Sequence, residues 1–472
     1  MTTLLAAPIP EEMLPGSQIA ILDPRNGSPV GTVTAASETE VDAALVAAQA
    51  AAAGWAAVSP ADRGAALHRL ADALETAADE LAEWNTRETG KPTEEALGGI
   101  GAGVGTLRQY AELGPVHRTH SLRGPSTAID YTLPVPRGVM VALTPWNDPV
   151  AVAVGLIGAA LVTGNVVVHK PSERCPHLGA RLGEVLAPLL PEGVLTTVTG
   201  GSEVGARLVA SPQVDVIAHV GSTAAGRRIA AAALETGAHV ICENGGNDAL
   251  LVDEDVDPQW AAAQAALGAF ANSGQICTSV ERIFVHHAVA EAFLAALVEE
   301  ARTRNTSRPL APLVDERMRV EVDQQVQDTL AAGATLLVGG EVPPGPGAHY
   351  PATVVTDCPP GSPLLREETF GPVAPVVVVA DFAEGLQLAV DDRYGLAATV
   401  LSGSLEHITD AVDALPVGTV KVNAVFGGAP GGAAQPRRDS GSGFGYGPEL
   451  LDEMTARKVV HIGRPVLSRR PE

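Results

Sequence analysis

The sequence predicts an α/β fold in which doubly wound parallel sheets are covered by helices. From residue 138 onward β-branched runs alternate with helical runs, which predicts strands near 139–143, 166–169, 194–199, 214–220 and 240–242. A second stretch of this kind runs from about 257 to 425, with strands near 283–285, 335–338, 376–379, 397–401 and 419–422. Strands that alternate with helices are typical of parallel sheets. The two stretches therefore indicate two α/β units.

The part before residue 138 is predicted to be mainly helical. Residues 1–36 form an irregular arm with β segments at 18–22 and 31–34. Ser37 and Glu40 have the spacing of a capping box, and Ser59 followed by a proline marks the start of the next helix. One face of that second helix carries the leucines that should pack against a core: Leu67, Leu70, Leu74 and Leu81.

Three further segments can be assigned from their composition. The glycine-rich run at 99–105 follows a helical pattern and not a strand, so it predicts helix packing or a loop and not a dinucleotide loop. The connection 339–361 is rich in Pro and Gly, which predicts a surface loop. After the glycine-rich stretch 427–447, a short helix leads to a strand at 459–462, which is expected to pair with another element or subunit.

Length and composition describe an ordinary globular protein of more than one domain. The chain has 472 residues, of which 46% are apolar and 18% charged, and its formal net charge is −24. So acidic a surface disfavours nucleic acid and anionic membranes as partners. No apolar run is long enough to span a bilayer, and the first residues lack the basic start of a signal peptide. We therefore expect a cytoplasmic protein.

The four cysteines form no disulfide framework, and they lack the paired spacing of a zinc site, so no metal is predicted: Cys175, Cys242, Cys277 and Cys358. Cys277 differs in its surroundings. It follows an alanine-rich helical run that Gly274 is expected to end, and it precedes the β-type run 283–285. A thiol on a turn between rigid elements is open to a substrate, although a lone cysteine is more often an inert core residue.

The first predicted sheet carries its polar residues where its strands end. Asn147 follows the first strand, and Lys170 and Glu173 follow the second. The segment Gly221-Ser-Thr-Ala-Ala-Gly226 follows the fourth strand, and Glu243 follows the fifth. Taken singly, each residue is explained as well by a turn or a solvated surface side chain. Together they lie at the carboxyl ends of parallel strands, where doubly wound sheets bind ligands.

Six motifs occur in a fixed order along the chain: Thr144-Pro-Trp-Asn147, Lys170-Pro-Ser-Glu173, Gly221-Ser-Thr-Ala-Ala-Gly226, Glu243-Asn-Gly-Gly246, Gly274-Gln-Ile-Cys277 and Glu368-Thr-Phe-Gly-Pro372. In order and spacing they resemble the motif set of the NAD(P)-dependent aldehyde dehydrogenase superfamily. The resemblance extends from Asp23-Pro24 and Glu88-Thr-Gly-Lys-Pro92 to Asp439-Ser-Gly441, which is nearly the whole chain. A single motif of this kind is weak, whereas six in order are specific.

The resemblance implies oxidation of an aldehyde to a carboxylic acid, with catalytic roles for Cys277, Glu243, Asn147 and Lys170. The Cys277 thiolate adds to the carbonyl, and the hemithioacetal passes a hydride to the nicotinamide, which leaves a thioester. The Asn147 amide and the Cys277 backbone N–H are expected to stabilise the oxyanion. Glu243 is expected to activate the water that hydrolyses the thioester.

The resemblance also implies a cofactor site formed by Thr144, Pro145, Trp146, Lys170, Ser172, Glu173, Gly221, Ser222, Gly226, Glu243, Gly245, Glu368 and Phe370. The 221–226 segment opens a helix after a strand, where free N–H groups favour a pyrophosphate. In the family, residues matching Lys170 and Glu173 hold the adenosine ribose, and a carboxylate there favours NAD over NADP. Glu368 matches the residue that holds the nicotinamide ribose, and Phe370 matches one that packs beside it.

The fold implied by the resemblance has two doubly wound, Rossmann-like α/β domains and a small β flap for oligomerisation. The NAD-binding domain is expected to contain 1–125 and 138–243, and the catalytic domain 244–430. Residues 126–137 and 431–472 are expected to form the oligomerisation arm and C-terminal tail, with the flap made by 128–136 and 459–466. The family implies a homodimer or homotetramer.

Departures from the family pattern leave the aldehyde open. They are Asp148 for a usual Phe, His219-Val220 for Phe-Thr, Asn244 for Leu, Asn247 for Lys, and Ala434-Gln-Pro436 for Phe-Gly-Gly. Asp148 is expected to favour a hydroxylated or cationic aldehyde, and the low aromatic content disfavours an aromatic-lined tunnel. Two alternatives remain: a coenzyme A-acylating enzyme, which Glu243 disfavours, and a non-catalytic NAD-binding relative, which the retained Cys277 and Asn147 disfavour.

Overall fold

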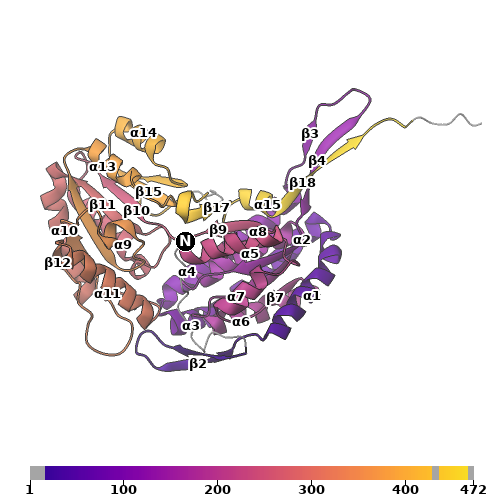
Figure 1. Cartoon of the computed structure of the whole chain (residues 1–472), viewed down its shortest axis with the longest axis horizontal. Coiled ribbons are helices and arrows are strands. Elements are labelled where there is room, and N and C mark those ends of the chain that lie inside the picture. The colour runs from indigo at the N-terminus through magenta and orange to yellow at the C-terminus, as the bar shows by residue number, and fades with distance from the viewer. Residues whose placement is uncertain (1–15, 428–434, 466–472) are drawn as a thin grey trace, which may run out of the picture.

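The computed structural model describes residues 16–427 and 435–465, in which two lobes lie side by side and a β arm projects from one of them (Figure 1). A six-stranded and a seven-stranded sheet form the centres of the lobes, and a two-stranded and a three-stranded sheet complete the strands described. The predicted α/β class with parallel sheets is confirmed. The domain limits near residue 243 stay a prediction.

The first sheet has the strand order β17-β9-β8-β5-β6-β7, and every neighbouring pair is parallel except that of β17 with β9. All five strands predicted from 138 onward are present. Its strands are β5 (Val139–Leu143), β6 (Val166–Lys170), β7 (Leu195–Thr197), β8 (Val216–Val220), β9 (His239–Glu243) and β17 (Gly441–Ser442), and its helices are α5 (Pro149–Val162), α6 (Pro176–Leu186), α7 (Ser202–Val209) and α8 (Thr223–Thr236). Strands β5 and β6 are buried along their whole length, as expected where both faces of a parallel sheet are covered.

Four helices precede this sheet and pack on its core: α1 (Glu38–Ala56), α2 (Pro60–Thr76), α3 (Ala78–Thr89) and α4 (Thr93–Leu113). The predicted capping box is confirmed, because Ser37 N donates to Glu40 Oε2 at 2.8 Å and Glu40 N to Ser37 Oγ at 3.3 Å. The assignment of Leu81 to the second helix is wrong. The chain turns at Ala77, so Leu81 lies in α3, although it shares the same core.

The glycine-rich run 99–105 lies inside α4, as the helix-packing alternative predicted. A Cβ on Gly103 would lie 2.8 Å from Val154 Cγ2 of α5, so glycine allows these two helices to approach closely. No helix in residues 16–427 or 435–465 combines the length and apolar character that crossing a bilayer requires.

The second sheet has the order β12-β13-β14-β11-β10-β15-β16, with only β12 antiparallel to its neighbour. Its strands are β10 (Asp248–Val252), β11 (Val280–His286), β12 (Thr335–Val338), β13 (Thr353–Thr356), β14 (Val373–Val379), β15 (Ala397–Leu401) and β16 (Thr419–Val422). One face packs on α9 (Pro258–Phe270) and α10 (His287–Thr306), and the other on α13 (Phe382–Val390) and α14 (Leu405–Ala414). Two further helices, α11 (Glu316–Ala331) and α12 (Pro363–Arg366), lie at the β12–β13 side.

Two strands of this sheet were not predicted. β13 lies within 339–361, so the prediction of a surface loop there is wrong for four buried residues that pair on both sides. β10 follows β9 after residues 244–247 and lies at the centre of the second sheet. It was not predicted because it begins with a polar residue and contains only one β-branched residue.

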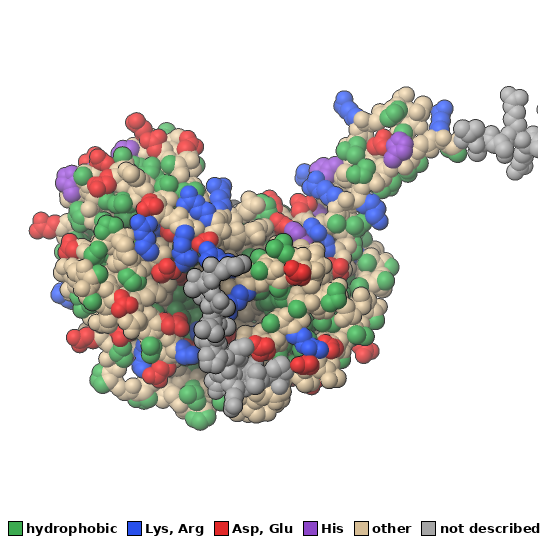
Figure 2. Space-filling model, viewed as in Figure 1, with side chains coloured by type: hydrophobic (Ala, Val, Ile, Leu, Met, Phe, Trp, Pro, Cys, Tyr) green, Lys and Arg blue, Asp and Glu red, His purple; other side chains and the backbone are tan. Residues whose placement is uncertain are grey.

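The projecting arm consists of β3 (His120–Leu122), β4 (Ile129–Pro136) and β18 (Thr455–Ile462), and α15 (Glu449–Glu453) leads into it. The predicted pairing of the terminal strand is confirmed, with β18 antiparallel to β4 from Thr455–Pro136 to Ile462–Ile129. The strand begins four residues earlier than expected, and Val466 lies outside the described residues. Figure 2 shows acidic and basic side chains interspersed over the lobes, with apolar side chains also on the arm.

The remaining elements are short. β1 (Gln18–Leu22) and β2 (Pro29–Thr34) are the two predicted β segments near the N-terminus, and they pair as an antiparallel hairpin. β17 was not predicted, because only two residues of the glycine-rich tail pair with β9. Single-turn 3₁₀ helices are η2 (Gly114–Val116), η3 (Ala187–Leu189), η4 (Ala271–Gly274) and η5 (Arg438–Ser440).

Candidate active site

The thiol of Cys277 lies against the carboxylate of Glu243, where the chain passes from the first sheet to the second. The Cys277 Sγ–Glu243 Oε1 distance is 3.2 Å, although the two residues are 34 apart in sequence. Glu243 is the last residue of β9, and Cys277 lies between η4 and β11. Cys277 is partly exposed, whereas the other three cysteines are buried. The structure therefore brings together the two residues that the sequence singled out as nucleophile and base.

The turn before Cys277 is unusual in its backbone. α9 ends at Phe270, earlier than the predicted end at Gly274, and the φ angles of Asn272, Ser273 and Gly274 are 47°, 57° and 76°. Three consecutive left-handed residues, two of them not glycine, are a strained arrangement that surrounding contacts must hold. A Cβ on Gly274 would lie 2.1 Å from the Gly371 carbonyl oxygen, so glycine is required there.

Gln275 holds this turn, a role that the sequence did not predict. Its Oε1 accepts from Val314 N at 2.8 Å, and its Nε2 donates to Asn272 O at 3.0 Å. Its own carbonyl accepts from Asn147 Nδ2 at 3.1 Å. The predicted oxyanion donor Asn147 thus lies beside the Cys277 turn, and its second amide proton has no acceptor among the described residues.

Buried carboxylates dominate the electrostatics of the site. Limited access to water and the neighbouring Glu243 raise the pKa of the Cys277 thiol well above its usual value. Burial raises the pKa of Glu243, although the Cys277 hydrogen bond opposes this. Burial also raises the pKa of Asp248 to about 8, of Glu281 to about 8 and of Glu368 to about 7. In this state the thiol is protonated, so a nearby positive charge would favour the thiolate.

Glu281 and Glu368 organise the loop that faces the Cys277 turn. Glu368 Oε1 accepts from Gly246 N at 2.9 Å, and a Cβ on Gly245 would lie 2.0 Å from Glu368 Oε2. Glu281 accepts from the backbone N–H groups of Thr369 and Phe370, each at 3.1 Å. Glu281 was not predicted, because a glutamate inside a buried strand has no motif of its own.

Phe370 of this loop contacts the other predicted aromatic residue, Trp146, which lies between β5 and α5. The rings of Trp146 and Phe370 meet edge to face with centroids 5.6 Å apart, and the Arg174 guanidinium lies over Trp146 at 5.3 Å. Phe370 has a φ of 52°, which the Glu281 hydrogen bond to its N–H helps to hold. The loop therefore connects the predicted cofactor residues to the buried Glu281.

The residues at the start of α8 fit a phosphate group. Ser222 caps the helix through Oγ, which accepts from Ala225 N at 3.3 Å, and the buried Thr223 Oγ1 has no partner among the described residues. A Cβ on Gly226 would lie 2.0 Å from Asn244 Oδ1, and one on Gly221 2.7 Å from the His219 ring. The helix start thus keeps free N–H groups and an unsatisfied hydroxyl, which suit an anionic cofactor.

The buried Lys170 at the end of β6 pairs with the half-buried Glu173. Their Nζ–Oε2 distance is 3.7 Å, and Lys170 Nζ also donates to Pro171 O at 3.1 Å. Burial lowers the pKa of Lys170, and the Lys170 ammonium holds the pKa of Glu173 below its usual value despite burial. Ser172 Oγ accepts from Arg174 N at 3.2 Å.

Thr144 and Pro145 are both buried at the end of β5. The Thr144 hydroxyl is paired with His169 Nε2 at 2.9 Å. The structure therefore does not bring the Thr144 side chain together with the Lys170–Glu173 pair.

The departure at Asp148 is compensated by a residue that was not predicted to act. Lys91 Nζ lies 3.5 Å from Asp148 Oδ1 and donates to the Asn147 carbonyl at 3.1 Å. A Cβ on Gly99 would lie 2.6 Å from Asp148 Oδ1, so α4 leaves room for this carboxylate. Asp148 is therefore an ion-paired residue and not a bare negative charge.

Of the other described departures, His219, Asn244 and Pro436 are buried, whereas Val220 is half-buried. Burial lowers the pKa of His219 to about 4, so this imidazole is neutral. Asn244 Nδ2 donates to Asp439 O at 3.0 Å. Gln435 is exposed and Pro436 is buried, while Ala434 lies outside the described residues.

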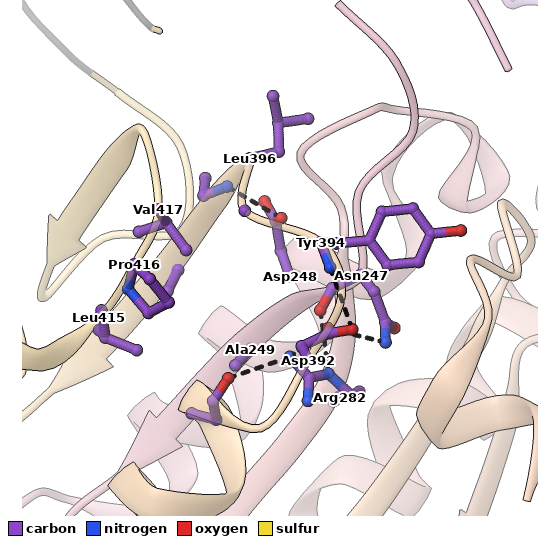
Figure 3. Close-up of a pocket in the computed structure, with 14 residues that line it drawn as sticks. Asn247, Asp248, Ala249, Arg282, Asp392, Tyr394, Leu396, Leu415, Pro416 and Val417 are labelled. Carbon is purple, nitrogen blue, oxygen red and sulfur yellow. Dashed lines mark hydrogen bonds and ion pairs between the residues drawn. The ribbon is translucent and has the colours of Figure 1, made fainter. Parts of the chain in front are cut away.

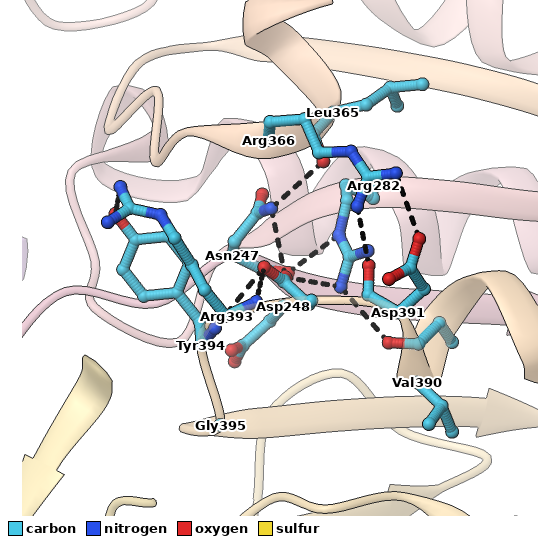
Figure 4. A network of polar contacts seen from close by, with 12 residues as sticks. Asn247, Asp248, Arg282, Leu365, Arg366, Val390, Asp391, Arg393, Tyr394 and Gly395 are labelled. Atoms are coloured by element: carbon cyan, nitrogen blue, oxygen red, sulfur yellow. Dashed lines mark hydrogen bonds and ion pairs between the residues drawn. The ribbon is translucent and has the colours of Figure 1, made fainter. Parts of the chain in front are cut away.

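Asn247 belongs to a buried polar network at the amino ends of β10 and β11 (Figure 4). The Arg282 guanidinium lies 2.7 Å from Asp392 Oδ2, with both side chains 5% exposed, and its Nε donates to Asn247 O at 2.9 Å. Asp248 Oδ1 accepts from Ala397 N at 3.0 Å beside a cavity of about 10 Å³ (Figure 3). This cavity has room for about one water molecule, so it is no substrate pocket.

Comparison with known proteins gives a consistent result. Residues 13–460 match the family described as "Aldehyde dehydrogenase family". Betaine aldehyde dehydrogenase of Cereibacter sphaeroides (strain ATCC 17025) is 34% identical over 470 residues, which cover 96% of this chain and 95% of that protein. Alpha-ketoglutarate semialdehyde dehydrogenase of Haloferax volcanii is 33% identical over 470 residues, which cover 94% of this chain and 96% of that protein.

A solved structure gives the same likeness in three dimensions. The crystal structure of succinate-semialdehyde dehydrogenase from Burkholderia pseudomallei has a TM-score of 0.91 and 31% identity, and the match covers 95% of both chains. With sequence and fold matched over nearly its whole length, this chain belongs to the aldehyde dehydrogenase family of NAD(P)-dependent oxidoreductases.

Proposed function

We propose that this enzyme oxidises an aldehyde to a carboxylic acid with NAD and water, through a covalent intermediate on Cys277. The observation that carries the proposal is the 3.2 Å contact between the Cys277 thiol and the Glu243 carboxylate. A nucleophile within hydrogen-bond reach of a base is the arrangement that covalent catalysis needs. The partial exposure of Cys277 leaves it open to a substrate.

The first step is addition of the Cys277 sulfur to the aldehyde carbon. The thiol proton leaves toward Glu243, and the carbonyl oxygen becomes an oxyanion. The free amide proton of Asn147, held beside the turn by its bond to Gln275 O, donates to this oxygen. NAD, when held by the residues at the start of α8 and at Glu368, would supply the hydride acceptor that converts the hemithioacetal to a thioester.

The second step is hydrolysis of the thioester. The proton that Glu243 took from the thiol must first pass to solvent. Glu243 then removes a proton from water, whose oxygen attacks the acyl carbon, and this proton passes to the Cys277 sulfur as the C–S bond breaks and the acid is released. Burial raises the pKa of Glu243 above that of a solvated glutamate, which makes it a better base near neutral pH. In the state described Glu243 accepts from the thiol, so it must turn from Cys277 to water between the steps.

We also propose that NAD is preferred over NADP. Glu173 lies at the end of β6 beside Lys170, with its pKa held below its usual value, so it is an anion. An anion there accepts a hydrogen bond from a ribose 2′-OH and repels a 2′-phosphate. Glu243 also favours hydrolysis over transfer to coenzyme A, because a base that activates water opposes capture of the thioester by another thiol.

A homodimer or homotetramer assembled through the arm is our proposal for the quaternary structure. The arm exposes apolar side chains that a monomer would leave in water: Ile129 at 63%, Val459 at 67% and Ile462 at 50%. Light scattering of the wild type and of a Val459→Lys variant measures the mass of the assembly. The mass of a monomer in both proteins would refute the proposed oligomer. A cytoplasmic location is proposed from the free cysteines.

The experiment that tests the function is NADH formation across a panel of aldehydes. Wild type is compared with Cys277→Ala and with the matched control Cys358→Ala, whose thiol is buried in another cluster. We expect wild type and Cys358→Ala to oxidise at least one aldehyde of the panel at similar rates. Cys277→Ala should lose at least about a thousandfold of that rate. NAD binding without turnover of any aldehyde would contradict the proposal and favour the non-catalytic alternative.

A further inference from the structure

Lys421 of β16 lies on the same face of the second sheet as Asp248. The register pairs Leu250 of β10 with Thr399 of β15, and Thr399 with Lys421. Paired residues of adjacent strands project from the same face, and residues two apart along a strand do so too. Asp248 precedes Leu250 by two residues, so its side chain and that of Lys421 share this face, on which α9 packs.

This face leads to the Cys277 turn. A Cβ on Gly246 would lie 2.6 Å from the Cys277 carbonyl oxygen and 3.0 Å from Asp248 Oδ1, so Asp248 lies directly beneath the turn. Burial lowers the pKa of Lys421, and the nearby Asp248 and Cys277 oppose this, so the ammonium lies within electrostatic range of both groups. Lys421 therefore brings a positive charge to the neighbourhood of the nucleophile.

The Lys421 ammonium is short of partners. Its Nζ lies over the Phe426 ring, 5.4 Å from the centroid. Among the described residues, no carboxylate lies within 4.0 Å of it and no hydrogen-bond acceptor within 3.5 Å. The other two lysines near the site are paired, Lys91 with Asp148 and Lys170 with Glu173. A partly buried ammonium with three unused donors is suited to bind an anion.

The surrounding charges do not cancel that of Lys421. Asp248 Oδ2 is buried and has no hydrogen-bond partner among the described residues, and burial raises the pKa of Asp248 to about 8. The Asp248 carboxyl is therefore mostly protonated at neutral pH and does not neutralise the Lys421 ammonium. At the other side, Asp148 is already neutralised by Lys91.

We propose that Lys421 binds the carboxylate of the substrate, and that the substrate is an aldehyde with a terminal carboxylate, the semialdehyde of a dicarboxylic acid. This inference rests on the proposed function, because the aldehyde end must reach Cys277. It replaces the expectation of a cationic aldehyde drawn from Asp148, whose charge Lys91 takes up. An aromatic face favours a quaternary ammonium, and the Phe426 face beside Lys421 is already occupied by the Lys421 ammonium.

The test compares aldehydes that differ only in the terminal carboxylate. Succinic semialdehyde is compared with butanal and glutaric semialdehyde with pentanal, with betaine aldehyde as the cationic probe. Wild type is expected to show a kcat/KM about 10- to 100-fold higher for the better semialdehyde than for its neutral partner. The ratio within one enzyme is read out, because changes in thiol reactivity affect both aldehydes alike.

The variants assign the preference to Lys421. Lys421→Met is expected to lower the ratio about 10- to 100-fold, and Lys421→Arg to retain most of it. The matched control is Lys458→Met on β18 of the arm, which keeps the wild-type ratio. As a measurement that needs no variant, succinate should inhibit butanal oxidation more strongly than butyrate does.

Either of two results would overturn the inference: a wild type that prefers butanal or betaine aldehyde, or an unchanged ratio in Lys421→Met. If Lys421→Met does not fold, equal inhibition by succinate and butyrate has the same meaning. Failure of the proposed function is distinct, because then no aldehyde of the series is oxidised at all.

Discussion

The two parallel sheets meet the active site at opposite edges. The first sheet contributes residues at or just beyond the carboxyl ends of its strands, among them Asn147, Lys170 and Glu243. The second sheet contributes residues at its amino edge, since Cys277 precedes β11 and Asp248 begins β10. The rule that ligands bind at the carboxyl ends of strands therefore holds for one sheet only.

The carboxyl edge of the second sheet is closed by its own side chains. Ser402 Oγ donates to Asp253 Oδ2 at 2.6 Å, and His407 Nδ1 lies 2.6 Å from the same oxygen. Asn423 accepts from Ser402 N and donates to Ser402 O, both at 3.0 Å. At the first sheet the corresponding positions carry glycine turns and a free helix start. The same architecture thus gives either a site or a sealed edge, depending on these short connecting segments.

The largest loss of activity is expected from a change at Glu243, which lies at the carboxyl edge of the first sheet. Glu243→Gln keeps the shape but removes the base, so steady-state oxidation should fall by about 10²- to 10⁴-fold. Rapid-quench measurement should show that the burst of NADH is slowed as well, because Glu243 also accepts the thiol proton in the first step. A burst at the wild-type rate would instead restrict the role of Glu243 to hydrolysis.

The pH dependence of the wild type sharpens this prediction. Only the Glu243 carboxylate can accept a proton from water, and burial raises its pKa. The rate of hydrolysis should therefore be lost as pH falls through that raised pKa, at a higher pH than for a solvated glutamate. Glu243→Gln should lack this limb of the pH–rate profile.

A smaller loss of kcat/KM is expected from a change at Asn147, which lies between β5 and α5. Asn147→Ala should lower kcat/KM by about 10²- to 10³-fold, as for removal of one oxyanion donor. Asn305→Ala is the matched control, since the Asn305 amide also donates to a backbone carbonyl, Ala352 O at 2.9 Å, but in the second lobe. The control should lose stability and keep kcat/KM; equal kinetic losses in both would contradict the assignment.

At the amino edge of the second sheet, Gly274 tests the strained turn. Gly274→Ala introduces a Cβ 2.1 Å from the Gly371 oxygen at a φ of 76°, whereas Gly237→Ala has a similar φ of 75° and no atom within 4 Å. Left-handed alanine alone costs about 1–2 kcal/mol. Urea denaturation should therefore show Gly274→Ala less stable than Gly237→Ala, by about 1 kcal/mol or more. Equal stabilities would mean that the turn is loosely held.

The sealed carboxyl edge should give the smallest effect. Asp253 raises the pKa of the partly exposed His407, so their pair stabilises the fold below the unfolded histidine pKa. This contribution is lost as pH rises through the raised pKa of His407. Asp253→Asn should therefore be less stable by no more than about 1 kcal/mol near pH 6, with a smaller difference at pH 9. Its kcat/KM should equal that of wild type, and any large kinetic loss would refute the sealed-edge interpretation.

Sequence reasoning succeeded where a short local signal carries the chemistry. The β-branched runs predicted the strands of the first sheet, and the motifs around Cys277 and Glu243 predicted two residues that prove to be in contact. The buried strands could be predicted because runs of apolar, β-branched residues form them. The spacing of the motifs also predicted which loops between these strands carry the site residues.

It failed where the signal depends on contacts across the fold. Glu281 looks like a surface glutamate until its strand is known to be buried, and Lys421 alternates with apolar residues as in any exposed strand. Asp148 suggested a negative pocket, because Lys91, 57 positions earlier in the chain, cannot be paired with it from sequence alone. Such partners are set by tertiary packing and not by local pattern.

The edge strand β17 has a consequence for the order in which the enzyme is made. Gly441 and Ser442 pair with Glu243 and Cys242, so residues that are synthesised long after both Glu243 and Cys277 complete the sheet edge beside the base. Until then β9 keeps an open edge, and the thiol lacks a fully held partner. A chain that is truncated before residue 441 would contain the nucleophile, but its base would lie on an unpaired strand. Assembly of the reactive centre is thus coupled to synthesis of a segment far downstream of both residues.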